Sequence, residues 1–179
     1  MSEISKKKIE DYLAFYNIEN YLFNNIGVKA KKRGFLQFSE FFEICMWKSK
    51  RPKQRYLKNK KLVEKITKKA FFETDELNKI KLLCTLEGIG IPTASALLSV
   101  VFPKKYPIID IRCLEQLKYL KYKISKYISE KVWIEYLEIM RNFASQYKKT
   151  PREIDKVLFA MHRETLNKKG YPNLYSKQR

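Results

Sequence analysis

The apolar residues of this chain recur mostly at α-helical spacing, and strand-like alternation is nowhere sustained. The clearest helix start is Thr150-Pro-Arg-Glu153, a capping box with proline at the first helical position. Ile154, Val157, Leu158 and Met161 follow it on one face. Helices are expected over residues 6–24, 35–47, 58–71, 75–86, 92–101, 110–122 and 129–147, and from residue 150 to about Gly170. The pattern predicts an all-α protein of about eight helices.

Capping residues predict several of the helix boundaries. We expect Gly27 to end the first helix, because glycine is a poor helix former. Thr74 or Asp75 caps the fourth helix, since both side chains can accept a hydrogen bond from a free amide of the first turn. For the same reason, Asp110 begins the sixth helix and Ser129 the seventh.

The charge of the chain is unusual. Its 179 residues include 38 Lys and Arg against 19 Asp and Glu, a formal net charge of +19. Codon bias in an AT-rich genome explains some of the lysine but not the shortage of acids. A surplus of this size favours a polyanionic partner, which is DNA, RNA or an anionic membrane surface.

The cysteines and the apolar runs exclude several classes of protein. Cys45, Cys84 and Cys113 lie far apart and are odd in number, so we expect neither zinc, nor an iron–sulfur cluster, nor a disulfide framework. They are typical of small buried residues in a reducing cytosol. The start of the chain has no signal-peptide pattern, and the longest apolar run, Ala94–Phe102, is too short to span a membrane. We therefore expect a cytoplasmic, nucleoid-associated protein.

The segment Gly88-Ile-Gly90 is the first candidate site. Two glycines permit a tight turn and a close approach of the backbone, and the following helix presents amides without an intrahelical partner. Such a helix start favours an anion, for example a phosphate. The alternative is an ordinary turn between two helices. Asp110, the second candidate, follows Gly90 by 20 residues.

Two stretches around these residues resemble one family. Leu86-x-Gly-Ile-Gly-x-x-Thr-Ala-x-x-Leu-Leu98 resembles the hairpin of the helix-hairpin-helix–GPD superfamily of DNA base-excision glycosylases, and Tyr106-Pro-Ile-Ile-Asp110 resembles the segment with its catalytic aspartate. The interval between them matches the endonuclease III and adenine-mismatch glycosylase branches. The resemblance implies a two-lobed all-α fold with the active site between the lobes. Residues 34–107 would form the lobe with the hairpin, and residues 1–33 and 108–179 would form the other.

The chain also departs from the family pattern. Bifunctional members have a nucleophilic lysine two residues after the second hairpin glycine, where this chain has Pro92. Strand cleavage by a hairpin lysine is therefore excluded, and we expect a monofunctional enzyme. The four-cysteine iron–sulfur cluster of several members is absent, and Ile111 and Arg112 replace the usual residues after the aspartate.

The resemblance implies that Asp110 is catalytic. A carboxylate beneath the deoxyribose stabilises the oxocarbenium character that develops as the base leaves, and it can activate the attacking water. The alternative is that Asp110 is only the N-cap of its helix. Glu43 is a candidate counterpart of the glutamate that protonates the departing base in the adenine-mismatch branch, and the alternative is a surface residue.

Further residues are candidates to hold DNA with an extruded base. Trp47, Tyr56 and Phe35 could stack on that base, although each could equally pack in the core. The basic segment Lys48–Arg55 could grip the DNA backbone, or could be a solvated loop or helix entry at Pro52. The full set of expected DNA contacts is Lys48, Arg51, Arg55, Gly88, Ile89, Gly90, Thr93, Ala94 and Arg112.

No cofactor is expected except a structural monovalent cation. By the family resemblance, it would be held by the main-chain carbonyls of Cys84, Leu86 and Ile89. His162 receives no role. The sequence leaves three functions open: a monofunctional DNA glycosylase that acts on double-stranded DNA as a monomer, a non-catalytic DNA-binding module, and a basic RNA-binding protein.

Overall fold

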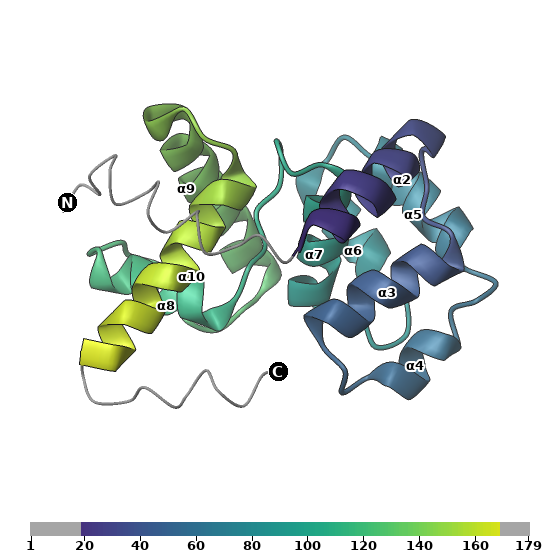
Figure 1. The fold of residues 1–179 in the computed structure, drawn as a ribbon, viewed down its shortest axis with the longest axis horizontal. Helices are drawn as coiled ribbons and strands as arrows, with labels where there is room; N and C mark the ends of the chain where they lie inside the picture. The colour runs from purple at the N-terminus through teal and green to yellow at the C-terminus, as the bar shows by residue number, and fades with distance from the viewer. Residues whose placement is uncertain (1–18, 169–179) are drawn as a thin grey trace.

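The computed structural model describes residues 19–168, and all regular structure within this range is helical. A π-helical segment, η2 (Leu22–Gly27), precedes nine α-helices (Figure 1). The helices are α2 (Val28–Arg33), α3 (Phe38–Lys48), α4 (Lys53–Leu57), α5 (Val63–Phe72), α6 (Glu76–Cys84), α7 (Ile91–Val101), α8 (Ile111–Tyr119), α9 (Glu130–Tyr147) and α10 (Pro151–Lys168). The prediction of an all-α protein is confirmed.

The helices lie in two groups, side by side in Figure 1. The first group runs from η2 to α7, and α7 is its centre, because η2, α2, α3 and α6 all contact it. Nine consecutive residues of α7, Thr93–Val101, are buried. The second group is α8, α9 and α10, in which α10 contacts both of the others. A connector, residues 102–110, leads from α7 to α8 between the groups.

The predicted capping residues begin their helices as expected. Asp75, Asp110 and Ser129 accept hydrogen bonds from the backbone amides of residues 78, 112 and 132 respectively. Before α10, the Thr150 amide donates to Glu153 Oε2 at 2.7 Å, and the Glu153 amide donates to Thr150 Oγ1 at 3.2 Å. These pairs satisfy amides that would otherwise have no partner in the first turn.

Gly27 does not end a helix, contrary to the prediction. The chain continues helically through it to Gly34, which has a φ of +86° and forms the C-cap of α2. Gly27 instead lies where η2 crosses α7, since a Cβ there would be 2.1 Å from the Val100 carbonyl oxygen. This close crossing places residues 22–33 with the first group, and not with the C-terminal helices as we expected. The helix expected over residues 6–24 lies mostly outside the described residues, as do Gly170 and Pro172.

The basic segment Lys48–Arg55 is a short loop followed by α4, and Pro52 is the N-cap of that helix. Cys45 and Cys113 are buried, as expected, and Cys84 is partly buried. Burial raises the pKa of the Cys84 thiol to about 11, and it also raises the pKa of Cys45 and of Cys113 well above the usual value of a thiol. Within residues 19–168, no helix has both the length and the apolarity needed to cross a membrane.

Candidate functional site: a basic cleft beside the glycine hairpin

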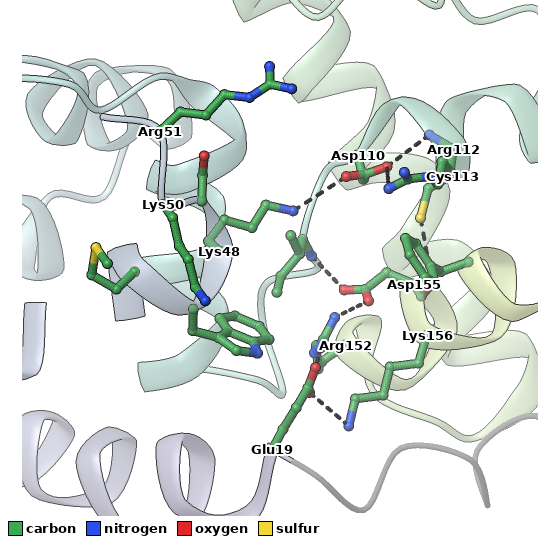
Figure 2. Close-up of a pocket in the computed structure, with 15 residues that line it drawn as sticks. Glu19, Lys48, Lys50, Arg51, Asp110, Arg112, Cys113, Arg152, Asp155 and Lys156 are labelled. Carbon is green, nitrogen blue, oxygen red and sulfur yellow. Dashed lines mark hydrogen bonds and ion pairs between the residues drawn. The ribbon is translucent and has the colours of Figure 1, made fainter. Parts of the chain in front are cut away.

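A cleft of about 670 Å³ lies between the two helix groups, and Asp110 is on its wall. The cleft is formed by the end of α3 with the loop after it, the connector, the start of α8, and one face of α10. Figure 2 shows these residues converging from both groups. The lining is Glu19, Met46, Trp47, Lys48, Ser49, Lys50, Arg51, Ile108, Asp110, Arg112, Cys113, Arg152, Asp155, Lys156 and Phe159.

Asp110 is both the N-cap of α8 and an acid that faces the cleft. Its Oδ1 accepts a hydrogen bond from the Arg112 amide at 3.0 Å, as an N-cap does. Its Oδ2 lies 3.5 Å from Lys48 Nζ, which reaches it from the other side of the cleft (Figure 2). The Arg112 guanidinium is 3.9 Å from Oδ1, and the Asp110 side chain is 22% exposed. The two interpretations of Asp110 from the sequence are therefore compatible.

Asp155 on α10 supports the connector from behind. Its Oδ2 accepts a hydrogen bond from the Ile108 amide at 2.5 Å, and its Oδ1 is paired with Arg152. Burial raises the pKa of Asp155 to about 7, although Arg152 and the Ile108 amide both act to lower it. Arg152 also donates to Glu19 at 2.6 Å.

Two neutral side chains hold the same connector. The Ser95 hydroxyl of α7 accepts from the Ile109 amide at 3.1 Å, and the Tyr136 hydroxyl of α9 donates to the Ile108 carbonyl at 3.0 Å. Together with Asp155, three helices therefore fix the two residues before Asp110. These hydrogen bonds restrict the backbone that carries Asp110.

The lining of the cleft carries more positive than negative charge. Its cationic side chains are Lys48, Lys50, Arg51, Arg112, Arg152 and Lys156, and its acids are Glu19, Asp110 and Asp155. Asp155 is buried among them. The arrangement favours an anionic ligand, such as a phosphodiester that crosses the mouth of the cleft.

The expected stacking residues differ in their placement. Trp47 lines the cleft and is 37% exposed, with its ring edge-on to Phe23 at 6.1 Å. Tyr56 is fully buried and lies edge-on to Phe41, so in this conformation a base cannot stack on it, contrary to the prediction. Phe35 is not among the lining residues and lies beneath the Arg33 guanidinium. Phe159 of α10 lines the cleft below Arg112, and sequence analysis missed it.

The glycine hairpin has the turn that its sequence predicts. Gly88 has a φ of +80°, a conformation that favours glycine, and Gly90 is exposed immediately before α7. Ile89, Thr93 and Ala94 are buried. Any contact of these three residues with DNA would therefore be made mainly by the backbone.

A buried asparagine holds the hairpin against α4. Asn59 Nδ2 donates to the Glu87 carbonyl at 2.9 Å, and the Glu87 amide donates to Asn59 Oδ1 at 2.7 Å. Arg55 and Pro52 lie against Gly88, where an added Cβ would come within 2.9 Å and 3.1 Å of their Cβ atoms. The hairpin is thus fixed to the basic segment.

The basic segment Lys48–Arg55 joins the hairpin to the cleft. Its first four residues line the cleft, and Arg55 at its end contacts the hairpin and is exposed. The structure therefore brings the expected contacts Lys48, Arg51, Arg55 and Arg112 onto one surface with Gly88 and Gly90. Glu43 is exposed on α3 and is not among the lining residues.

The expected cation position stays a prediction. The Leu86 carbonyl accepts a hydrogen bond from the Ile89 amide at 3.1 Å, which gives the turn its shape. Among the described residues, no group of three or more His, Cys, Asp or Glu side chains could hold a metal ion. His162, for which we expected no role, pairs with Glu115 of α8 at 2.9 Å.

Comparison of the chain with protein-family models, curated proteins and solved structures finds no match. The functional assignment therefore rests on the cleft and the hairpin themselves.

Proposed function

We propose that this protein is a DNA N-glycosylase that extrudes a damaged or modified nucleotide and hydrolyses its glycosidic bond. The observation that carries the proposal is the placement of Asp110 in a basic cleft that Lys48–Arg55 connects to the glycine hairpin. A backbone held at the hairpin and along this segment would bring an extruded deoxyribose to the acid. The finer fold that we propose is the two-lobed glycosylase arrangement, with the hairpin in the first helix group and the active site between the groups.

The chemistry requires a fixed negative charge and a positioned water. As the bond from the base to C1′ breaks, positive charge develops on the sugar, and the Asp110 carboxylate stabilises it and orients the attacking water. Trp47 offers a partly exposed ring at the cleft on which the extruded base can stack. Lys48, Lys50, Arg51 and Arg112 would hold the flanking phosphates.

A second candidate is a DNA-binding module without catalysis. The observation that favours it is the double pairing of Asp110 with Lys48 and Arg112, which gives the carboxylate a structural role between the helix groups. The exposed position of Glu43 outside the cleft also leaves the enzyme without an identified proton donor for the base. We prefer the enzyme because the N-cap geometry leaves Asp110 Oδ2 directed into the cleft.

The test is release of bases from duplexes that each carry one lesion, with abasic sites revealed by alkali. Wild type should release at least one base, and Asp110→Asn should lower the rate by about 10²–10³-fold. Asparagine is nearly isosteric and still accepts the Arg112 amide, so the variant should bind DNA normally. Binding without release of any base by wild type would favour the module, and preference for RNA over duplex DNA would contradict both candidates.

Glu43→Gln serves as a second measurement in the same assay. If Glu43 is a surface residue, as its exposure indicates, the rate of base release stays near that of wild type. A loss similar to that of Asp110→Asn would instead show that α3 moves when DNA binds and brings Glu43 to the base.

A further inference from the structure

Lys48 occupies a special position among the lysines of the cleft. Of the three lysines in the lining, Lys48 is the one paired with Asp110, and its side chain is only 16% exposed. Lys156 instead faces Glu19 at 3.2 Å, and Lys50 is exposed at the rim. Lys48 therefore presents a primary amine at the position where the proposed function places C1′ of the sugar.

We propose that Lys48 forms an imine with the ring-opened sugar left after base removal, and so cleaves the DNA strand at abasic sites. The inference rests on the proposed function, because that function delivers an aldehyde to the cleft. The sequence predicted a monofunctional enzyme because the hairpin has no nucleophilic lysine. A lysine outside the hairpin would make the enzyme bifunctional. The amine here comes from the end of α3, on the opposite side of the cleft from Asp110.

The chemistry balances with the groups already present. The Lys48 ammonium gives a proton to the Asp110 carboxylate beside it, and the amine nitrogen adds to the C1′ carbonyl. The adduct loses one water to form the imine, and the imine makes the C2′ proton acidic. Asp110 gives its proton to the departing water and then takes up the C2′ proton, and the bond from C3′ to oxygen breaks to expel the 3′ phosphate. Water then hydrolyses the unsaturated imine, which frees the lysine and replaces the water lost earlier.

The structural alternative is that Lys48 only pairs with Asp110 and joins the two helix groups. Arginine separates the alternatives, because it keeps the positive charge and can pair with a carboxylate but forms no stable imine. Lys48→Arg should therefore fold as wild type does, and fluorescence anisotropy measures any change in its binding to DNA. Lys156→Arg is a matched control that removes another lysine of the same cleft, one that pairs with Glu19.

The experiment uses the full chain and a duplex with a preformed abasic site, in the presence of sodium borohydride. Borohydride reduces the imine to a stable amine, so a reacting protein becomes covalently attached to the DNA strand. Wild type and Lys156→Arg should form this adduct at similar rates. Lys48→Arg should lose it to the level of a protein-free control, and peptide mass spectrometry of the wild-type adduct should place the sugar remnant on Lys48.

The outcomes separate this inference from the proposed function. An adduct that persists in Lys48→Arg, or that maps to many surface lysines, would overturn the role of Lys48 while base release by wild type still stands. Release of bases by wild type without any covalent adduct would also overturn the role of Lys48 and leave the proposed function standing. Trapping at Lys48 without release of any base would support the amine chemistry and contradict the glycosylase. Thermal unfolding of each variant checks that a lost adduct does not come from a lost fold.

Discussion

At the residue scale, the two hairpin glycines differ in what they tolerate. Gly88 has a φ of +80°, and an added Cβ would lie 2.9 Å from the Arg55 Cβ. Gly90 has a φ of −104°, and an added Cβ would meet only Pro92 Cδ, at 3.9 Å. The fold therefore requires glycine at position 88, whereas it tolerates a side chain at position 90. Glycine at position 90 can then serve the contact with a ligand.

Gly88→Ala should lower the free energy of unfolding by about 1–3 kcal/mol, because alanine is strained at positive φ and collides with α4. Gly90→Ala should change it by less than about 0.5 kcal/mol. Gly90→Ala should still weaken binding to DNA, by the same factor for every duplex sequence, because the hairpin approaches the backbone and not the bases. Urea unfolding and fluorescence anisotropy measure the two effects. Unchanged binding of Gly90→Ala would remove the hairpin from the DNA interface.

Asp155 makes a residue-scale prediction about pH. Its pKa is about 7 in the folded protein and about 3.9 in an unfolded chain. The folded state therefore binds more protons between these values, and the contribution of Asp155 to stability is present at pH 4 and is lost as the pH rises to 7. The charged groups that act on it are Arg152, Glu19 and Lys48.

We therefore expect the stability of wild type minus that of Asp155→Asn to fall by about 1–3 kcal/mol between pH 5 and pH 8. Urea unfolding of both proteins at each pH gives this difference, and the subtraction removes the titration of most other groups. A difference that grows with pH would show that Arg152 outweighs burial at this site.

At the scale of elements, the hairpin and α4 form one unit through Asn59. The side chain is fully buried and bonds both the amide and the carbonyl of Glu87. Although Glu87 is exposed, both of its backbone groups bond to this buried side chain, so the hairpin depends on a residue outside its own motif.

Asn59→Ala should lower the free energy of unfolding by about 1–3 kcal/mol, because it removes both hydrogen bonds to the Glu87 backbone. Asn59→Asp should cost at least as much, because it still accepts the Glu87 amide but places a buried carboxylate oxygen against the Arg55, Tyr56 and Glu87 carbonyls. Hydrogen exchange should show faster exchange at Glu87 in the alanine variant, with α10 unaffected. An aspartate variant that is more stable than the alanine variant would mean that the bond to the Glu87 amide holds the turn.

Local signals in the sequence were enough to predict the helix starts. The side chains of Asp75, Asp110 and Ser129 each accept a hydrogen bond from an amide of the following helix. A few neighbouring residues therefore determine where each helix begins. The burial of Tyr56 could not be predicted, because it depends on Phe41 and on the hairpin. The buried position of Asp155 could have been predicted from the sequence. It lies three residues before Leu158, within the apolar face of α10, and a buried acid requires a partner.

At the scale of the whole molecule, the net charge of +19 becomes a prediction about salt. If about five phosphates are contacted along the hairpin, the basic segment and the cleft, the logarithm of the binding constant should fall with the logarithm of salt concentration at a slope of about −4 to −5. Anisotropy titrations over a range of salt concentrations measure it. Arg55→Gln should reduce the slope by about 1. A slope near zero would contradict binding to a polyanion at this surface.

The crossing of η2 over α7 has a consequence for what sequences this protein can accept. Only a hydrogen atom fits between Gly27 and the Val100 carbonyl, since a Cβ would lie 2.1 Å from that oxygen. A library with all twenty amino acids at position 27, sorted by survival under protease, should return glycine alone. Position 90 in the same library format should return many residues. Folding therefore requires a close approach of the backbone at Gly27 and at Val100, which are more than seventy residues apart in the chain.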